Sequence, residues 1–160
     1  MKITTSLVVA ASALATSAVV GIASAPLASA DNYPINQGFG TSEELVDGAG
    51  TIVQSWRVHD LRPSSDAISW PVHGKLWEAT VTVRAVRGTV TPIISDFNAR
   101  ARNGQNYQVL ALVASPQGLN PSTLAQGGKS TGKLYFDVVG PAPDSVVYDA
   151  GGRDLLFWVR

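Results

Sequence analysis

The sequence contains no cysteine among its 160 residues, and only two histidines. The absence of cysteine excludes disulfide bonds, thiol catalysis, zinc–thiolate centres and haem attachment. Small exported domains commonly depend on disulfides. A domain without them must be held together by side-chain packing and hydrogen bonds.

The first thirty residues have the pattern of an export signal. Lys2 is followed by an uncharged run from Ile3 to Ala25, and the segment ends in Ala28-Ser29-Ala30 before Asp31. A basic tip, an apolar middle and small residues at the cleavage point are typical of a Sec-type signal peptide. We therefore expect a signal peptide over residues 1–30 and a secreted, extracellular protein. An uncleaved anchor is the alternative, but the run is built largely on alanine and is interrupted by serine and threonine.

The rest of the chain carries almost no net charge. The full sequence has 12 basic and 12 acidic side chains, and removal of the signal peptide takes only Lys2 from this balance. A near-neutral protein has no long-range field that attracts nucleic acid, and no polybasic run predicts binding to a membrane surface. Residues 31–160 have the length of one domain, and no second apolar run of membrane-spanning length follows Asp31.

Alternation with a period of two dominates the chain after residue 50. In residues 76–87, the odd positions from Trp77 to Ala85 are apolar and the even positions from Glu78 to Arg84 are polar. This pattern predicts a long strand with one face toward solvent. Asn103-Gly104 is typical of a hairpin turn, because both residues tolerate a positive φ. Further strands are predicted at 51–58, 90–101, 107–114, 133–139, 145–148 and 154–159.

These elements predict an all-β protein, an antiparallel β-sandwich over residues 31–160. Residues 31–50 form a leading arm with one short edge strand, and 61–74 and 115–128 form long loops. Because there are no cysteines to link the sheets, we expect the packing between them to depend on large aromatic side chains, namely Trp56, Trp77, Phe136 and Trp158. An up-and-down barrel with an internal cavity is the alternative architecture.

Several runs of the sequence resemble a known family. They are VHDL at 58–61, LWEATVTVRAVRGTVTP at 76–92, FNARARNGQNYQVL at 97–110, STGKLYFDVVGPAP at 130–143 and DLLFW at 154–158. The chain resembles the mycobacterial secreted immunogenic antigens, the immunoprotective extracellular protein family of the MPT/MPB series. This resemblance implies an immunoglobulin-like sandwich, export and antigenicity. It brings no catalytic residues with it, and the chain departs from the family in loops 115–128 and 149–153.

Catalytic and metal-binding patterns are weak. His59 and His73 stand without a G-x-S-x-G nucleophile motif, so no serine hydrolase is predicted. Asp60 and Glu78 form the best acid pair for a glycoside hydrolase, with Glu78 expected on the solvent face. The spacing of His59, Asp60 and His73 does not match a zinc site. A calcium site is conceivable only in the last loops, at Asp144, Asp149 and Asp154. We predict no catalytic residue, metal or cofactor.

Two features are candidates for partner binding. If the strands that carry Arg84, Arg100 and Arg102 pair, these arginines form a local basic patch for an acidic protein surface or an anionic glycan. The favoured alternative is that they protect sheet edges against aggregation. Trp70 lies in a polar loop and is either a plug over the end of the sandwich or an exposed binding anchor.

The favoured hypothesis is a secreted, non-enzymatic and monomeric β-sandwich that binds a protein or cell-surface partner. One alternative is a carrier that holds an apolar ligand between the sheets. The other is a hydrolase of envelope polymers that uses Asp60 and Glu78.

Overall fold

A computed structural model describes residues 36–160. The predicted signal peptide, residues 1–30, lies outside the described residues. None of the helices within residues 36–160 has the length and apolar character needed to cross a membrane. The elements are β1 (Gln37–Gly38), β2 (Ser42–Val46), β3 (Val53–Val58), β4 (Arg62–Pro63), β5 (Lys75–Arg87), a 3-10 helix (Ile94–Asp96), β6 (Phe97–Ala101), β7 (Asn106–Gln108), β8 (Lys129–Val138), β9 (Pro143–Ala150) and β10 (Arg153–Val159).

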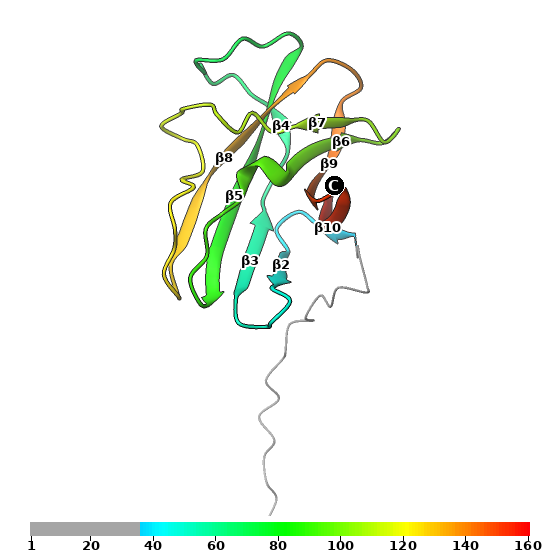
Figure 1. The fold of residues 1–160 in the computed structure, drawn as a ribbon. Coiled ribbons are helices and arrows are strands. Elements are labelled where there is room, and N and C mark those ends of the chain that lie inside the picture. The colour runs from blue at the N-terminus through cyan, green and yellow to red at the C-terminus, as the bar shows by residue number, and fades with distance from the viewer. Residues whose placement is uncertain (1–35) are drawn as a thin grey trace, which may run out of the picture.

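The strands form two sheets that face each other (Figure 1). The first sheet has the order β1-β10-β9-β6-β7. In the second sheet β5 is central, with β3 and β4 along one edge, β8 along the other, and β2 outside β3. All pairs are antiparallel except β1 with β10. The prediction of a cysteine-free, immunoglobulin-like antiparallel sandwich is confirmed, and two separate sheets replace the alternative closed barrel.

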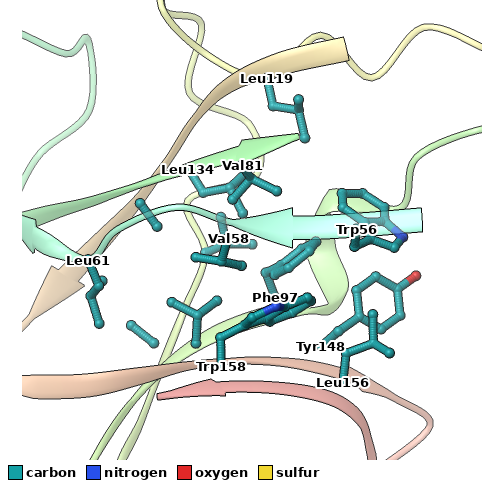
Figure 2. Packing of buried hydrophobic residues seen from close by; sticks show 14 of the residues in the cluster. Trp56, Val58, Leu61, Val81, Phe97, Leu119, Leu134, Tyr148, Leu156 and Trp158 are labelled. Atoms are coloured by element: carbon teal, nitrogen blue, oxygen red, sulfur yellow. The ribbon is translucent and has the colours of Figure 1, made fainter. Parts of the chain in front are cut away.

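The core lies between the two inner faces. The odd-numbered residues of β5 from Trp77 to Ala85 are all buried, as the alternation predicts. Trp56, Phe136 and Trp158 are fully buried as well. Figure 2 shows the large side chains of both sheets meeting in one cluster. Phe97, which the sequence did not single out, lies at its centre.

Phe97 contacts three aromatic rings. Its ring centroid lies 4.9 Å from that of Trp56, 5.0 Å from Tyr148 and 6.4 Å from Trp158. The first two contacts are edge-to-face, an arrangement that aromatic quadrupoles favour. Trp56 belongs to the second sheet, whereas Phe97, Tyr148 and Trp158 belong to the first, so the contact of Phe97 with Trp56 joins the two layers.

Two predicted strands are shorter than expected. Residues 90–101 are not one strand, because the chain forms a 3-10 helix at Ile94–Asp96 after Pro92, which has no N–H for a ladder. In residues 107–114, strand β7 ends at Gln108, and the N–H of Val109 still donates to the Phe97 carbonyl of the first sheet at 3.0 Å. The N–H of Leu110 then donates to the carbonyl of Tyr135, at 2.8 Å, so the chain crosses to the edge of β8. The hairpin turn at Asn103-Gly104 is confirmed, but only Gly104 has a positive φ, of +88°, and Asn103 does not.

Gly132 allows a loop to cover the free edge of β8. A Cβ at this position would lie 2.5 Å from backbone atoms of Leu119. The N–H of Lys133 donates to the Gln117 carbonyl at 2.8 Å, and Leu119 returns a bond to the Lys133 carbonyl at 3.0 Å. Covering an edge in this way protects a sheet from pairing with another chain.

We predict that Phe97→Ala destabilises the protein by about 3–5 kcal/mol, because it removes a fully buried ring and leaves a cavity between the sheets. Urea unfolding followed by tryptophan fluorescence measures this loss. Leu112→Ala is the control, since Leu112 is 84% exposed and its loss should change stability by less than about 0.5 kcal/mol. Similar losses in the two variants would contradict the assigned core.

Candidate functional site

The outer face of the second sheet is divided into a covered half and an open half. The even-numbered side chains of β5 point to this face, from Glu78 at one end to Arg84 at the other. The loop of residues 64–74 approaches the sheet beside Glu78 through the hydrogen bonds described below. The two halves differ sharply in how their charges are balanced.

In the covered half, Glu78 is a buried carboxylate whose oxygens are fully engaged. Its side chain keeps only 4% of its exposure. Arg62 donates to Oε1 from Nε at 3.0 Å and from Nη2 at 2.8 Å, and Ser64 and Lys133 donate to Oε2 at 2.6 and 3.0 Å. The expectation that Glu78 faces solvent is wrong, because alternation identifies the face of a strand and not the loop that covers it.

Asp66 continues this network. Its Oδ2 accepts hydrogen bonds from Lys133 Nζ and from the Tyr135 hydroxyl, both at 2.7 Å. The hydrogen bond from Lys133, followed by the one from Tyr135, lowers the pKa of Asp66. The same contact with Asp66 raises the pKa of Lys133, and burial raises the pKa of Tyr135. We call Arg62, Ser64, Asp66, Glu78, Lys133 and Tyr135 the charge network.

The other end of the loop is held by Asp137. Its two carboxylate oxygens each accept a backbone N–H at 2.8 Å, from His73 and Gly74. Burial opposes ionisation of Asp137, but these backbone bonds outweigh it and lower its pKa. The loop is therefore fastened to the sheet at both ends.

The predicted acid pair does not face a substrate cleft. Asp60 Oδ1 accepts the backbone N–H of Thr80 at 2.8 Å, and its Oδ2 lies 3.7 Å from Arg62 Nε. Glu78 is enclosed by three donor side chains. Both carboxylates are bonded to groups of the protein itself, so their contacts stabilise the fold and leave no acid pair facing a cleft.

The open half contains a shallow groove of about 230 Å³. We call it the basic groove; it is lined by Ser42, Ser55, Arg57, Thr82, Arg84 and Lys129. Its three cations come from three adjacent strands, β3, β5 and β8. Among the described residues, no carboxylate lies within ion-pairing distance of any of the three.

Strand register sets the geometry of the basic groove. Arg84 is directly opposite Lys129 on one side and Ser55 on the other. Arg57 is opposite Thr82 and therefore diagonal to Arg84. Arg57 Nε donates to Ser42 Oγ at 2.9 Å, which orients the guanidinium. Such positions bring Cβ atoms to roughly 5 Å for direct pairs and 7–8 Å for diagonal ones.

The predicted arginine patch does not form. Arg84 belongs to the second sheet, whereas Arg100 is on β6 of the first sheet and Arg102 lies in the turn after it. Arg100 is paired with Asp154, which raises its pKa. Arg102 is paired with Asp144 at 3.1 Å.

The interpretation of Arg84 as an edge guard is also wrong, because β5 is the central strand of its sheet. Arg57 and Lys129 were not predicted as neighbours of Arg84. Only the pairing register brings them together, and register across strands separated by long loops was not readable from the sequence.

Trp70 lies in the covering loop and retains 40% of its exposure. Trp70 is not among the residues that line the basic groove. A binding role for it stays a prediction.

Each of the three aspartates predicted as possible calcium ligands is instead bonded to an arginine or a backbone N–H of the protein. Asp144 is paired with Arg102, Asp154 with Arg100, and Asp149 accepts the Gly152 N–H at 3.0 Å. Within residues 36–160, no group of three or more histidine, aspartate or glutamate side chains could hold a metal ion.

The histidines contact neighbouring polar groups. His73 Nδ1 lies 3.2 Å from Asp137. His59 Nε2 lies 2.9 Å from the Thr82 hydroxyl, which in turn contacts Thr131 at 2.8 Å, so this chain of polar groups borders the basic groove.

The carboxyl of Glu43 points toward the space between the sheets. It is opposite the buried Trp56 on β3, and its Oε1 accepts the backbone N–H of Phe157 on β10 at 3.3 Å. Burial raises the pKa of Glu43 to about 7, against a smaller lowering by the Phe157 bond.

Comparison with known proteins gives consistent matches along the whole chain. The family described as "Domain of unknown function (DUF1942)" matches residues 34–158. The immunogenic proteins MPB63 of Mycobacterium bovis and MPT63 of Mycobacterium tuberculosis are each 45% identical over 159 residues, 99% of both chains. The crystal structure of the secreted protein MPT63 matches with a TM-score of 0.76 and 46% identity, covering 80% of this chain and 98% of that one. None of these descriptions indicates a catalytic family.

We predict that Lys133→Met destabilises the protein by about 2–4 kcal/mol, because it leaves Glu78 and Asp66 with fewer compensating donors in a poorly solvated place. Lys129→Met is the matched control on the same strand. It removes an exposed lysine without an ion pair and should change stability by less than about 0.5 kcal/mol. Equal unfolding midpoints in urea for the two variants would show that the charge network contributes nothing.

We predict a pH dependence of stability from Glu43. Its pKa in the folded protein lies above the ordinary value of 4.5, so the folded state binds the proton more tightly. The resulting stabilisation is complete below about pH 4.5 and is lost as the pH rises toward 7. The expected loss is on the order of 1–2 kcal/mol, because Glu43 is only half-buried.

Urea unfolding at intervals from pH 4.5 to 7.5 measures this slope. Glu43→Gln should flatten it by removing the titrating group. Glu44→Gln, one residue along on the other face of β2, should leave it unchanged. A wild-type slope that survives in Glu43→Gln would assign the pH dependence to other groups.

Proposed function

The chain belongs to the DUF1942 family of mycobacterial secreted immunogenic proteins, and from this premise we propose that it acts outside the cell by binding a negatively charged partner, without catalysis. The observation that carries the proposal is the basic groove. Three cations without carboxylate partners meet there on an otherwise neutral protein.

The arrangement of these cations is unfavourable for folding. Like charges directly opposite each other on neighbouring strands are destabilising, and Arg84 and Lys129 are such a pair. An anionic partner that binds between them would relieve this repulsion. Arg62, Arg100 and Lys133, by contrast, each have a carboxylate partner.

Binding is better supported than hydrolysis. A general acid or nucleophile needs a carboxyl that can reach the substrate and exchange a proton. Glu78 is enclosed by Arg62, Ser64 and Lys133, and it has no free oxygen to offer. We therefore expect no hydrolysis of envelope polymers.

Binding at the surface is also better supported than transport of an apolar ligand. The inner faces of the two sheets meet in a cluster centred on Phe97, Trp56 and Trp158 (Figure 2). Close-packed interiors leave little room for a guest. The groove on the outer face is polar, which suits charge recognition by a monomer.

We predict that the protein binds immobilised polyanions through the basic groove and that salt weakens this binding. The probes are dextran sulfate and poly-L-glutamate, with uncharged dextran as the blank, in biolayer interferometry at 50 and 300 mM NaCl. Arg84→Gln should lose about tenfold in affinity for whichever polyanion binds, a loss expected for one charge-assisted contact. Arg102→Gln is the control, since it removes the same charge from the first sheet.

Equal losses in the two variants would mean that general charge drives the binding, and the groove would then have no function in it. Failure of both polyanions to bind the wild-type protein at low salt would overturn the proposal. A circular dichroism spectrum and an unfolding midpoint for each variant show that it is folded.

A further inference from the structure

The chemistry of the basic groove narrows the kind of anion it accepts. Three of its features bear on this question: the absence of an apolar anchor, the number of its cations and its hydroxyl groups. The inference that follows rests on the function proposed above.

All six residues that line the groove have polar or charged side chains. None of the exposed large hydrophobic side chains of the described residues is among the six groove residues. Protein–protein binding sites are dominated by a few aromatic or apolar anchors set in desolvated pockets. The groove therefore lacks what a protein partner would need for affinity, and an acidic protein surface is disfavoured.

The cations exceed what one carboxylate can use. A carboxylate presents two oxygens and is satisfied by a single guanidinium fork. Arg57, Arg84 and Lys129 approach from three adjacent strands, diagonally and directly opposite one another. A tetrahedral sulfate or phosphate ester has three terminal oxygens, so it can accept from more than one of these cations at once. Arginine is the preferred side chain for such planar, bidentate contacts.

The hydroxyl groups add neutral donors between the cations. Ser55 and Thr82 lie next to Arg84 and Arg57 in the register, and Thr82 is joined to Thr131 and His59 along the border of the groove. Hydroxyls donate to ester oxygens and also exchange hydrogen bonds with sugar hydroxyls. A sugar ring that carries an ester would thus find partners for both of its parts.

We infer that the basic groove binds sulfate or phosphate monoester groups carried by a polysaccharide. The ester oxygens lie between the Arg84 and Arg57 guanidinium groups, with Lys129 as the third cation. Recognition depends on charge and is screened by salt.

Isothermal titration with four probes tests the inference. They are a sulfated hexasaccharide prepared from heparin, a hexagalacturonate that has carboxylates but no ester, an acidic hexaglutamate peptide, and inorganic sulfate. We expect the sulfated hexasaccharide to bind about tenfold more tightly than the hexagalacturonate, and inorganic sulfate to compete with it at a single site.

Variants relate the preference to the groove. Arg84→Gln should weaken binding of the sulfated hexasaccharide about tenfold, and Arg84→Lys should keep the charge but reduce the preference over hexagalacturonate, because lysine has no bidentate fork. Arg102→Gln should leave both affinities within about twofold. Unfolding midpoints confirm that each variant is folded.

The outcomes separate this inference from the proposed function. Equal affinity for the sulfated and carboxylated hexasaccharides, or binding of hexaglutamate alone, would overturn the ester inference and leave binding of an anionic partner in place. Binding of inorganic sulfate with no gain from the sugar would overturn the polysaccharide as the source of the ester. Binding of none of the probes would overturn both.

Discussion

The buried charge network around Glu78 determines the shape of the surface on which function depends. A carboxylate with 4% exposure is costly unless each oxygen is bonded. Here Arg62, Ser64 and Lys133 supply the donors, and Asp66 shares the lysine. Ser64 and Asp66 belong to the loop that follows β4. The hydrogen bonds of the charge network therefore also hold this loop against the sheet. The loop covers one half of the outer face and leaves the other half open.

The open half differs from the covered half in how its cations are balanced by carboxylates. In the covered half, Arg62 pairs with Glu78 and Lys133 with Asp66. On the first sheet, Arg100 pairs with Asp154, and Arg102, in the turn after β6, pairs with Asp144. Arg57, Arg84 and Lys129 are grouped on one small surface without such partners. The chain has as many acidic as basic side chains, so the lack of carboxylates near these three cations does not follow from its composition. Residues that break a local rule of stability are expected where a protein binds something.

The alternation in residues 76–87 was sufficient to predict the long strand and its inner face. It was insufficient for the outer face, because a period of two says which side chains share a face and nothing about the loop that lies over them. Glu78 was expected in solvent for this reason. The partners of Arg84 depend on the register of β5 with β3 and β8, and Lys129 reaches it only after the loop 115–128. Such register follows from long-range pairing, which local patterns do not encode.

The basic groove is built on regular strands, and this affects how it can bind. Backbone hydrogen bonds between β3, β5 and β8 hold Arg57, Arg84 and Lys129 in position, so little backbone has to be ordered when an anion arrives. A shallow, solvent-exposed site of this kind gives modest affinity for one ester group, because water and salt screen each contact. A polymer with many esters rebinds locally whenever one group leaves, which raises the effective concentration at the site. The density of esters along the polymer, more than the strength of a single contact, should therefore set the affinity of this protein for its partner.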